Sequence, residues 1–255
     1  MQRIFPFSRT YNFRELGGYP TQDGRQIRWH KILRSGYLTE LTSSELKQLK
    51  AYGLRYVVDL RSDYEQQSWP DPTPNFLTIY SLPLYPAEGN GARLYQTLPP
   101  SDQYHDLGQI YQQAVLDRHS QKVFRQFFQI LLANDQPNQS LVFHCAAGKD
   151  RTGILAILFL LLMKVPVNYI IQDYLLTNLM YQKDVDLRAL DNPQDTTIQA
   201  MNFTRAEQTA VPAIQRAITD IYGSWTNFQQ QILHLSTSDY QRLQDLYLYT
   251  IRPQN

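Results

Sequence analysis

The chain has 255 residues, of which 43% are hydrophobic, and its 24 basic and 23 acidic residues leave a formal net charge of +1. A chain of this size and composition can bury one substantial core, so we expect a single domain over residues 1–255. The balanced charge argues against recruitment of the whole chain to nucleic acid or to an anionic membrane.

In chain order, residues 1–10 come first and lack the charged and then apolar pattern of a signal peptide. We therefore expect a cytoplasmic protein, although a non-classical export route would leave no such pattern. Residues 12–19 include Gly17 and Gly18 and predict a loop. Residues 32–36 predict a short strand that ends in a turn.

A helix is predicted next, because Thr42 and Glu45 have the spacing of a capping box and apolar side chains follow at helical intervals until Gly53. Residues 54–60 are rich in Val and predict a strand with Asp59 near its end. Another strand is predicted at residues 76–84. The first part of the chain thus alternates between strand and helix.

Residues 86–119 are mostly polar, contain Gly89 and Gly91, and become weakly helical toward their end. Two interpretations of this segment remain open. It forms either a lid, which would have to move to admit a large substrate, or an ordinary exposed insertion.

The second half of the chain is mainly helical in pattern. Residues 151–165 predict a buried helix that ends before Pro166, and their apolar run is shorter than the roughly 20 residues that span a bilayer, so we expect no stable membrane insertion. Residues 141–143 predict a short apolar strand. Further helices are predicted at residues 123–132, 167–190, 206–222, 225–233 and 238–249. The predicted fold class is therefore α/β, with a central, mostly parallel sheet flanked by helices and a helical C-terminal half.

The segment between the apolar strand at 141–143 and the helix that follows it has the features of an anion-binding loop. Consecutive backbone N–H groups of such a loop point inward, and the N-terminus of a helix favours negative charge. We expect this loop to bind phosphate through Ala146, Ala147, Gly148, Lys149 and Thr152.

Cys145 and Arg151 predict what the loop does with a bound phosphate. A cysteine at the base of such a loop is favoured as the thiolate, which is the nucleophilic form, and Arg151 offers two parallel N–H donors to phosphoryl oxygens. Thr152 is expected to donate to the sulfur when it leaves, and His144 to order the loop. The alternative, a buried core thiol beside a surface arginine, does not account for the accompanying Gly148 and Gly153.

Residues 144–153 resemble the Cys-x5-Arg signature of the protein tyrosine phosphatase superfamily, and specifically the Cys-x-x-Gly-Lys-Asp-Arg loop of an atypical bacterial and fungal group. Similar motifs lie at residues 12–18, 33–36, 59–62 and 173–178, so the resemblance covers about residues 10–180. It implies a tyrosine-phosphatase fold, helices that cover the site near residues 86–119, and hydrolysis of phosphotyrosine through a phosphocysteine. Secreted members of that group also act on phosphoinositides.

Three aspartates are candidates for the general acid that protonates the leaving group. Asp150 is favoured because it lies within the loop itself, beside Arg151. Asp59 is either the acid or a support for the loop. Asp71 follows Trp69 and Pro70, as in the mobile acid loop of conventional tyrosine phosphatases, but it lies far from Cys145 in the chain, and a Pro-Asp-Pro segment forms turns by itself.

Lys149 also has two open interpretations: extra positive charge for phosphoinositides, or a partner for a nearby carboxylate. The remaining histidines lack the spacing of metal ligands, and the chain has one cysteine, so we expect no metal, no cofactor and no internal disulfide. The expected partner is a phosphorylated protein or a phosphoinositide. Two other functions remain: a pseudophosphatase that binds without turnover, and another oxyanion enzyme.

Overall fold

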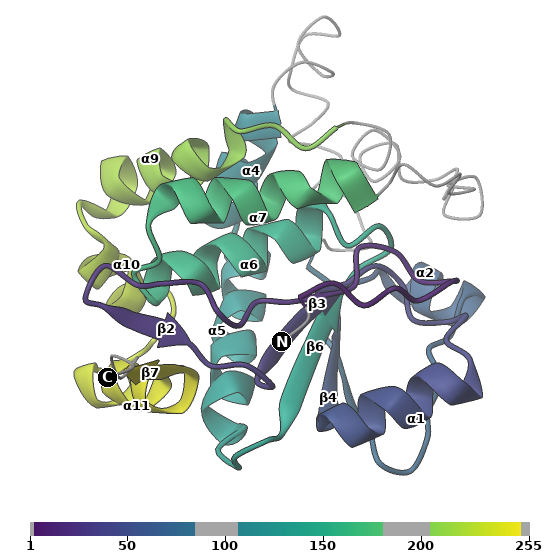
Figure 1. Cartoon of the computed structure of the whole chain (residues 1–255). Helices are drawn as coiled ribbons and strands as arrows, with labels where there is room; N and C mark the ends of the chain where they lie inside the picture. The colour runs from purple at the N-terminus through teal and green to yellow at the C-terminus, as the bar shows by residue number, and fades with distance from the viewer. Residues whose placement is uncertain (1–2, 85–106, 181–204, 251–255) are drawn as a thin grey trace, which may run out of the picture.

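The computed structural model describes residues 3–84, 107–180 and 205–250 (Figure 1). In chain order its elements are β1 (Arg14–Glu15), β2 (Arg25–Ile27), β3 (Ile32–Ser35), α1 (Ser43–Tyr52), β4 (Leu54–Asp59), α2 (Asp63–Ser68), β5 (Thr78–Ser81), α4 (Leu107–Leu116), α5 (Arg118–Ala133), β6 (Ser140–His144), α6 (Asp150–Leu162), α7 (Val167–Met180), α9 (Ala210–Tyr222), α10 (Trp225–Gln231), α11 (Thr237–Tyr247) and β7 (Leu248–Thr250). Three strands come first, strands then alternate with one or two helices up to α6, and the later described elements are mainly helices.

The central sheet has the strand order β1-β3-β6-β4-β5. β1 is antiparallel to β3, and the other neighbours are parallel, which confirms the predicted α/β class with a mostly parallel sheet. Ser35 of β3 and Asp59 of β4 both pair with His144 of β6. Parallel strands present their carboxyl ends at one edge of the sheet, where ligands of α/β proteins bind. Cys145 therefore begins its loop at that edge, with β3 and β4 on either side.

Successive side chains of the central strands point to opposite faces of the sheet and fill two separate cores. On β6, Leu141 and Phe143 belong to the larger core, where Phe143 contacts the ring of Phe127 on α5 at a centroid distance of 5.1 Å. Val142 belongs to the smaller core, together with Leu49 of α1. Helices α5 and α6 accordingly cover one face of the sheet and α1 covers the other (Figure 1). Burial on both faces explains why the three central residues of β6, 141–143, are all apolar.

Helix α1 has the ends that the sequence predicts. Thr42 and Glu45 form a complete capping box, and the helix stops at Gly53, which has a φ of 113°. A Cβ at Gly53 would lie 2.2 Å from the carbonyl oxygen of Asn138, so only glycine fits there. Helix α6 ends at Leu162, a little before the predicted boundary at residue 165.

Several features differ from the sequence prediction, and residues 14–15, within the loop predicted over residues 12–19, form β1. The helix expected over 238–249 ends at Tyr247, and the next residues form β7, which pairs with β2 through Ile27 and Leu248. This pairing joins two segments that are far apart in the chain. The helical periodicity of residues 238–249 gives no indication of such a distant contact. The short helix α2 was not predicted either, although Ser62 and Glu65 have the spacing of a capping box.

The segment predicted as a lid or an insertion is only partly described. Residues 86–106 lie outside the described residues, as does the part of the helix predicted over 167–190 that follows Met180. The remainder of the candidate lid contains α4, which packs against α9 and α5. Within residues 3–84, 107–180 and 205–250, no helix combines the length and the apolar composition needed to cross a membrane.

Candidate active site

The loop after β6 folds back on itself around the cysteine. The backbone N–H of Gly148 donates to the Cys145 sulfur at 3.2 Å. Gly148 has a φ of 67°, and a Cβ there would lie 2.4 Å from the backbone nitrogen of Gly36 and 2.5 Å from the carbonyl oxygen of Ser35. The end of β3 therefore leaves room only for glycine at this position. Cys145 is 2% exposed, so the sulfur lies at the bottom of the loop.

Arg151, in the first turn of α6, is held by Glu65 of α2. The two terminal nitrogens of its guanidinium lie 2.6 and 2.8 Å from the two carboxylate oxygens of Glu65. Such a two-bond pair fixes the plane of the guanidinium. Burial alone would raise the pKa of Glu65, but Arg151 outweighs it and the pKa is lowered to about 2. Glu65 also accepts from the backbone of Ser62, so the cap of α2 and the position of Arg151 depend on one carboxylate.

Asp150, the first residue of α6, is 3% exposed. Its Oδ1 accepts a hydrogen bond of 2.7 Å from the Tyr111 hydroxyl, and its Oδ2 lies 3.5 Å from Nζ of Lys149. Burial raises the pKa of this carboxyl above its usual range, although Lys149 and Tyr111 act in the opposite direction. A carboxyl group that keeps its proton more readily than usual is suited to proton donation.

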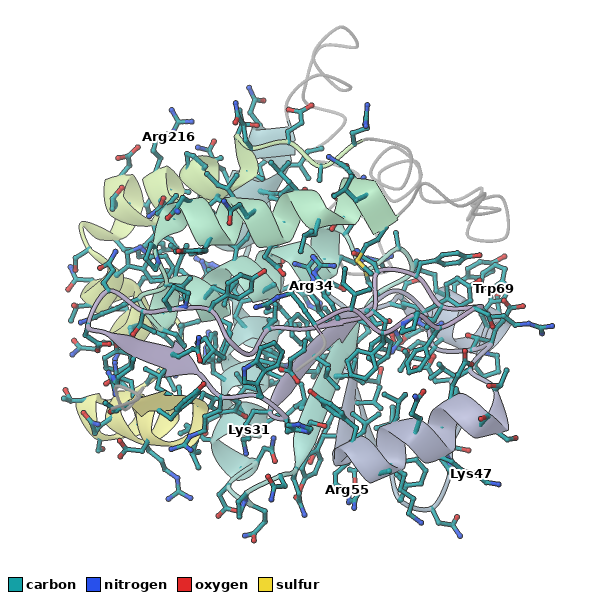
Figure 2. All side chains as sticks on the ribbon, viewed as in Figure 1. Lys31, Arg34, Lys47, Arg55, Trp69 and Arg216 are labelled. Carbon is teal, nitrogen blue, oxygen red and sulfur yellow. The ribbon has the colours of Figure 1, made fainter. Side chains whose placement is uncertain are left out.

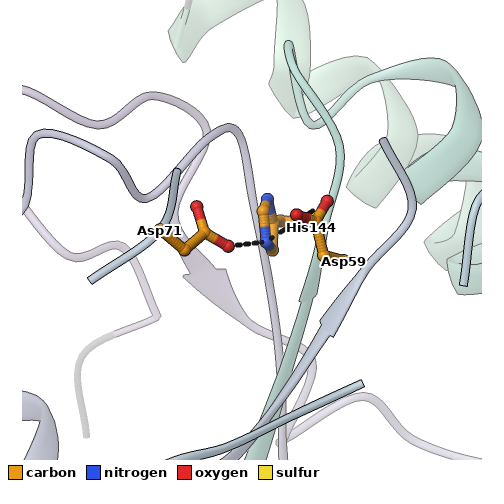
Figure 3. Close-up of side chains that lie close together, drawn as sticks. All are labelled: Asp59, Asp71 and His144. Carbon is orange, nitrogen blue, oxygen red and sulfur yellow. Dashed lines mark ion pairs between the residues drawn. The ribbon is translucent and has the colours of Figure 1, made fainter. Parts of the chain in front are cut away.

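The other two acid candidates belong to one buried group, the two-aspartate cluster, which consists of Asp59, Asp71, Arg61 and His144. Arg61 lies 2.7 Å from a carboxylate oxygen of Asp59 and 2.8 Å from one of Asp71. Figure 3 shows the imidazole of His144 between the two carboxylates, with Nε2 at 2.8 Å from Asp71 and 3.7 Å from Asp59. Aspartate and histidine can also ligate metal ions, but here the guanidinium of Arg61 already supplies a cation to both carboxylates.

The charges of the two-aspartate cluster have opposite effects on its members. Burial would lower the pKa of His144, but the carboxylates of Asp71 and Asp59 raise it above its usual value. Burial would likewise raise the pKa of Asp71, but His144 and Arg61 lower it. Asp71 therefore holds a proton less readily than Asp150 does. Its chain segment is irregular and does not form the turn expected of a Pro-Asp-Pro sequence, and its carboxylate is turned inward into the cluster.

A second buried group, the two-arginine cluster, supports the loop from the other side and consists of Arg14, Arg34 and Asp173. Asp173 lies 2.9 Å from Nε of Arg14 and 2.8 Å from a terminal nitrogen of Arg34. Burial would raise the pKa of Asp173, but the two arginines lower it to about 2. Arg34 lies in the interior of the molecule, whereas Lys47, Arg55 and Arg216 lie at its outer edge (Figure 2). Arg14, Arg34 and Asp173 lie in motifs of the resemblance, but the sequence does not indicate that they contact one another.

The two-arginine cluster is connected to the loop by hydrogen bonds to backbone carbonyls. Arg34 donates to the carbonyl oxygen of Gly148 at 2.9 Å, and the side-chain amide of Asn12 donates to the same oxygen at 2.7 Å. Asn12 also contacts the hydroxyl of Thr177 on α7. These bonds fix the carbonyl of Gly148, the residue whose backbone N–H donates to the Cys145 sulfur.

The family model described as "Tyrosine phosphatase family" matches residues 5–249. The chain belongs to the tyrosine phosphatase family. The resemblance expected over residues 10–180 therefore extends nearly to the end of the chain.

Three curated relatives have related names. A putative tyrosine-protein phosphatase of Cupriavidus necator is 30% identical over 178 residues, which cover 68% of this chain and 62% of the relative. A tyrosine-protein phosphatase of Nostoc commune is 33% identical over 163 residues, which cover 62% of this chain and 53% of the relative. The triple specificity protein phosphatase PtpB of Mycobacterium tuberculosis is 26% identical over 191 residues, covering 66% of this chain and 67% of the relative. The chain thus spans between about half and two thirds of the length of these relatives.

Thr152 and His144, which are predicted to assist the phosphate-binding loop, make few side-chain hydrogen bonds to it. Among the described residues, Oγ1 of Thr152 is buried without a hydrogen-bond partner, so its predicted donation to the Cys145 sulfur is not made in this structure. Nδ1 of His144 lies 3.3 Å from the carbonyl oxygen of Cys145, and its other ring nitrogen faces the two-aspartate cluster. His144 thus links the end of β6 to that cluster.

Proposed function

We propose that the protein hydrolyses phosphate monoesters, phosphotyrosine among them, with Cys145 as the nucleophile. The observation that carries this proposal is the loop itself: a buried cysteine accepts a backbone N–H at its base, and an arginine with a fixed guanidinium lies at the start of the following helix. This arrangement suits a phosphoryl group, because the N–H groups, the helix N-terminus and Arg151 all favour its negative oxygens. Membership of the tyrosine phosphatase family supports it.

The proposed reaction has two displacements at phosphorus. The thiolate of Cys145 forms the S–P bond while the ester P–O bond breaks, and Asp150 gives its proton to the departing oxygen. Water then attacks the phosphocysteine and gives a proton back to Asp150, and the thiolate leaves. Arg151 and the loop N–H groups bind the non-bridging oxygens in both steps. Glu65 acts through Arg151 and is therefore a positioning residue.

We assign the acid role to Asp150 rather than to Asp59 or Asp71. Its raised pKa supports a protonated carboxyl, whereas both carboxylates of the two-aspartate cluster are paired with Arg61. The cluster instead supports the loop through His144. Asp59 remains a supporting residue in this assignment, as one of the two sequence interpretations has it.

The substrate range proposed is phosphotyrosine, with phosphoserine, phosphothreonine and phosphoinositides as further substrates. One relative is named a triple specificity protein phosphatase, which supports breadth. Lys149 lies 3.5 Å from Asp150, and the positive charge that it adds to the loop favours highly charged phosphate esters.

We further propose that one domain carries the whole reaction. Cys145 and the apolar side chains of α9 and α11 belong to the same buried core, for example Ile214 and Leu243. The described part of the candidate lid, α4, is packed into the protein and supplies Tyr111 to Asp150. No lid function is therefore assigned to α4, and residues 86–106 of the segment lie outside the described residues.

Hydrolysis of an aryl phosphate by purified wild-type protein tests this function. We expect turnover that Cys145→Ser abolishes and that Arg151→Lys lowers by about a hundredfold, because lysine cannot form the two-bond contact. The turnover rate of Glu65→Gln should lie between the rates of wild type and Arg151→Lys. Phosphotyrosyl-peptide binding by a folded wild-type protein without turnover would instead identify a pseudophosphatase.

A further inference from the structure

Two buried tyrosines are linked to Asp150 by hydrogen bonds, and they have no role in the two displacement steps described above. Tyr111 comes from α4 and Tyr174 from α7, and both side chains are 0% exposed. The Tyr111 hydroxyl donates to Oδ1 of Asp150 at 2.7 Å, and the two tyrosine hydroxyls are hydrogen-bonded to each other. Their rings meet edge to face, with centroids 6.0 Å apart. Three polar groups from three helices thus form one buried chain.

The direction of this chain follows from its protons. A tyrosine hydroxyl carries one proton, and that of Tyr111 is donated to the carboxylate. Tyr174 must therefore donate to the oxygen of Tyr111. Burial and the neighbouring Asp150 raise the pKa of both tyrosines well above the usual value, so both keep their protons wherever the enzyme works. Donation in series polarises the Tyr111 hydroxyl and strengthens its bond to Asp150.

The positions of both rings are set by packing. Tyr174 lies directly against α6, because a Cβ on Gly153 would approach its ring to 3.0 Å. Helix α4, which carries Tyr111, packs against α9 and α5. The hydroxyl of Tyr111 therefore reaches Asp150 from a helix that is packed against two others.

We infer that Tyr111, supported by Tyr174, is a positioning residue that holds the carboxyl of Asp150 in one orientation and stabilises its ionised form. The inference rests on the proposed acid role of Asp150. With Oδ1 occupied as an acceptor for Tyr111, the proton destined for the leaving group is carried on Oδ2. The Tyr111 hydrogen bond also limits how tightly Asp150 binds its proton, so that Asp150 can still donate this proton to the leaving group.

The groups around Asp150 determine how its pKa should change when the Tyr111 hydroxyl is removed. Lys149 and Arg151 act on it from its own loop and helix, Tyr111 from α4, and Tyr174 through Tyr111. Burial raises the pKa of Asp150, and Lys149, Tyr111 and Arg151 lower it. Removal of the Tyr111 hydroxyl takes away one of the lowering contributions, so the pKa of Asp150 rises further.

The test compares the pH dependence of aryl phosphate hydrolysis in wild type and Tyr111→Phe. A general acid must be protonated, so activity falls as pH rises through its pKa. We expect this alkaline limb to move upward by about one pH unit in Tyr111→Phe. We also expect kcat to fall more for a poor leaving group than for an activated one, because an oriented acid matters more there. Tyr174→Phe should give a smaller shift in the same direction.

The matched control is Tyr247→Phe. The Tyr247 hydroxyl is also buried, but it donates to the backbone carbonyl of Leu131, so its removal should lower thermal stability without moving the pH profile. If Tyr111→Phe does not fold, Tyr174→Phe carries the test. A limb that stays in place in the folded variant, or moves equally in the control, overturns the inference.

A second readout separates this inference from the proposed function. Carbon-13 labelling of aspartate carboxyls, with the Asp150 signal assigned through Asp150→Asn, gives the pKa of Asp150 directly by NMR. The inference predicts a higher midpoint in Tyr111→Phe than in wild type even if the protein shows no turnover, which would contradict only the proposed function. Equal midpoints contradict the inference whatever the activity.

Discussion

The two buried charged clusters beside the loop differ in their balance of charge. The two-arginine cluster holds one carboxylate between two guanidinium groups, and its surplus N–H donors reach the loop carbonyls. The two-aspartate cluster holds one guanidinium between two carboxylates, and its surplus negative charge raises the pKa of the adjacent His144. The first support is therefore independent of pH around neutrality, whereas the second depends on the protonation of an imidazole.

The largest effect is expected from Asp173→Asn, which leaves two buried guanidinium groups without a counterion. We expect a loss of about 3–5 kcal/mol in the free energy of unfolding, measured by urea denaturation at neutral pH. The pKa of Asp173 is depressed to about 2, so its contribution is present above the ordinary carboxyl value and is lost as pH falls through about 2. Wild type should lose stability in that window, and Asp173→Asn should lose less. Equal acid sensitivity of the two proteins would contradict the role of this carboxylate.

A smaller and pH-dependent effect is expected from Asp71→Asn, which removes the carboxylate nearest to His144. Arg61 keeps its ion pair with Asp59, so we expect the free energy of unfolding to fall by only about 2 kcal/mol. The folded-state pKa of His144 is raised, so its contribution is fully present below the unfolded value and is lost as pH rises through the folded value. The difference between wild type and variant should therefore be largest in mildly acidic solution and should shrink at alkaline pH. A difference that grows with pH would refute this.

The smallest effect is expected from Arg242→Ala, which breaks an ion pair on the surface. Arg242 lies 3.4 Å from Asp135, but both side chains are largely exposed, at 58% and 44%. Solvent screens such a pair, so the free energy of unfolding should change by at most about 0.5 kcal/mol at any ordinary salt concentration. A loss comparable with that of Asp71→Asn would mean that burial is not what distinguishes the two-aspartate cluster from a surface ion pair.

The sequence predicts the parts of the site that are local in the chain. Cys145, Gly148, Asp150 and Arg151 lie in one segment between a strand and a helix, and the structure places this segment at the carboxyl edge of the parallel strands. The chemistry of a single loop needs no knowledge of the rest of the fold. The mostly parallel sheet is predictable for a similar reason, because short apolar strands alternate with capped helices.

The supports of the loop are not local, and this is why the sequence does not reveal their partners. Arg14 and Asp173 are 159 residues apart, and Arg151 is 86 residues from Glu65. Motifs of the resemblance indicate that residues near Arg14 and Asp173 matter, but not that they touch. Tyr111 lies in a segment that the sequence offered only as a lid or an exposed insertion, although its side chain is fully buried against Asp150.

The central claim, covalent catalysis by Cys145, is tested most directly by trapping its intermediate. Wild-type protein mixed with an aryl phosphate and quenched in acid within the first turnover is digested and analysed by mass spectrometry. We predict a phosphoryl adduct on Cys145 in wild type and none in Cys145→Ser, together with loss of turnover in that variant. Sustained hydrolysis by folded Cys145→Ser, or an adduct on another residue, would contradict the account.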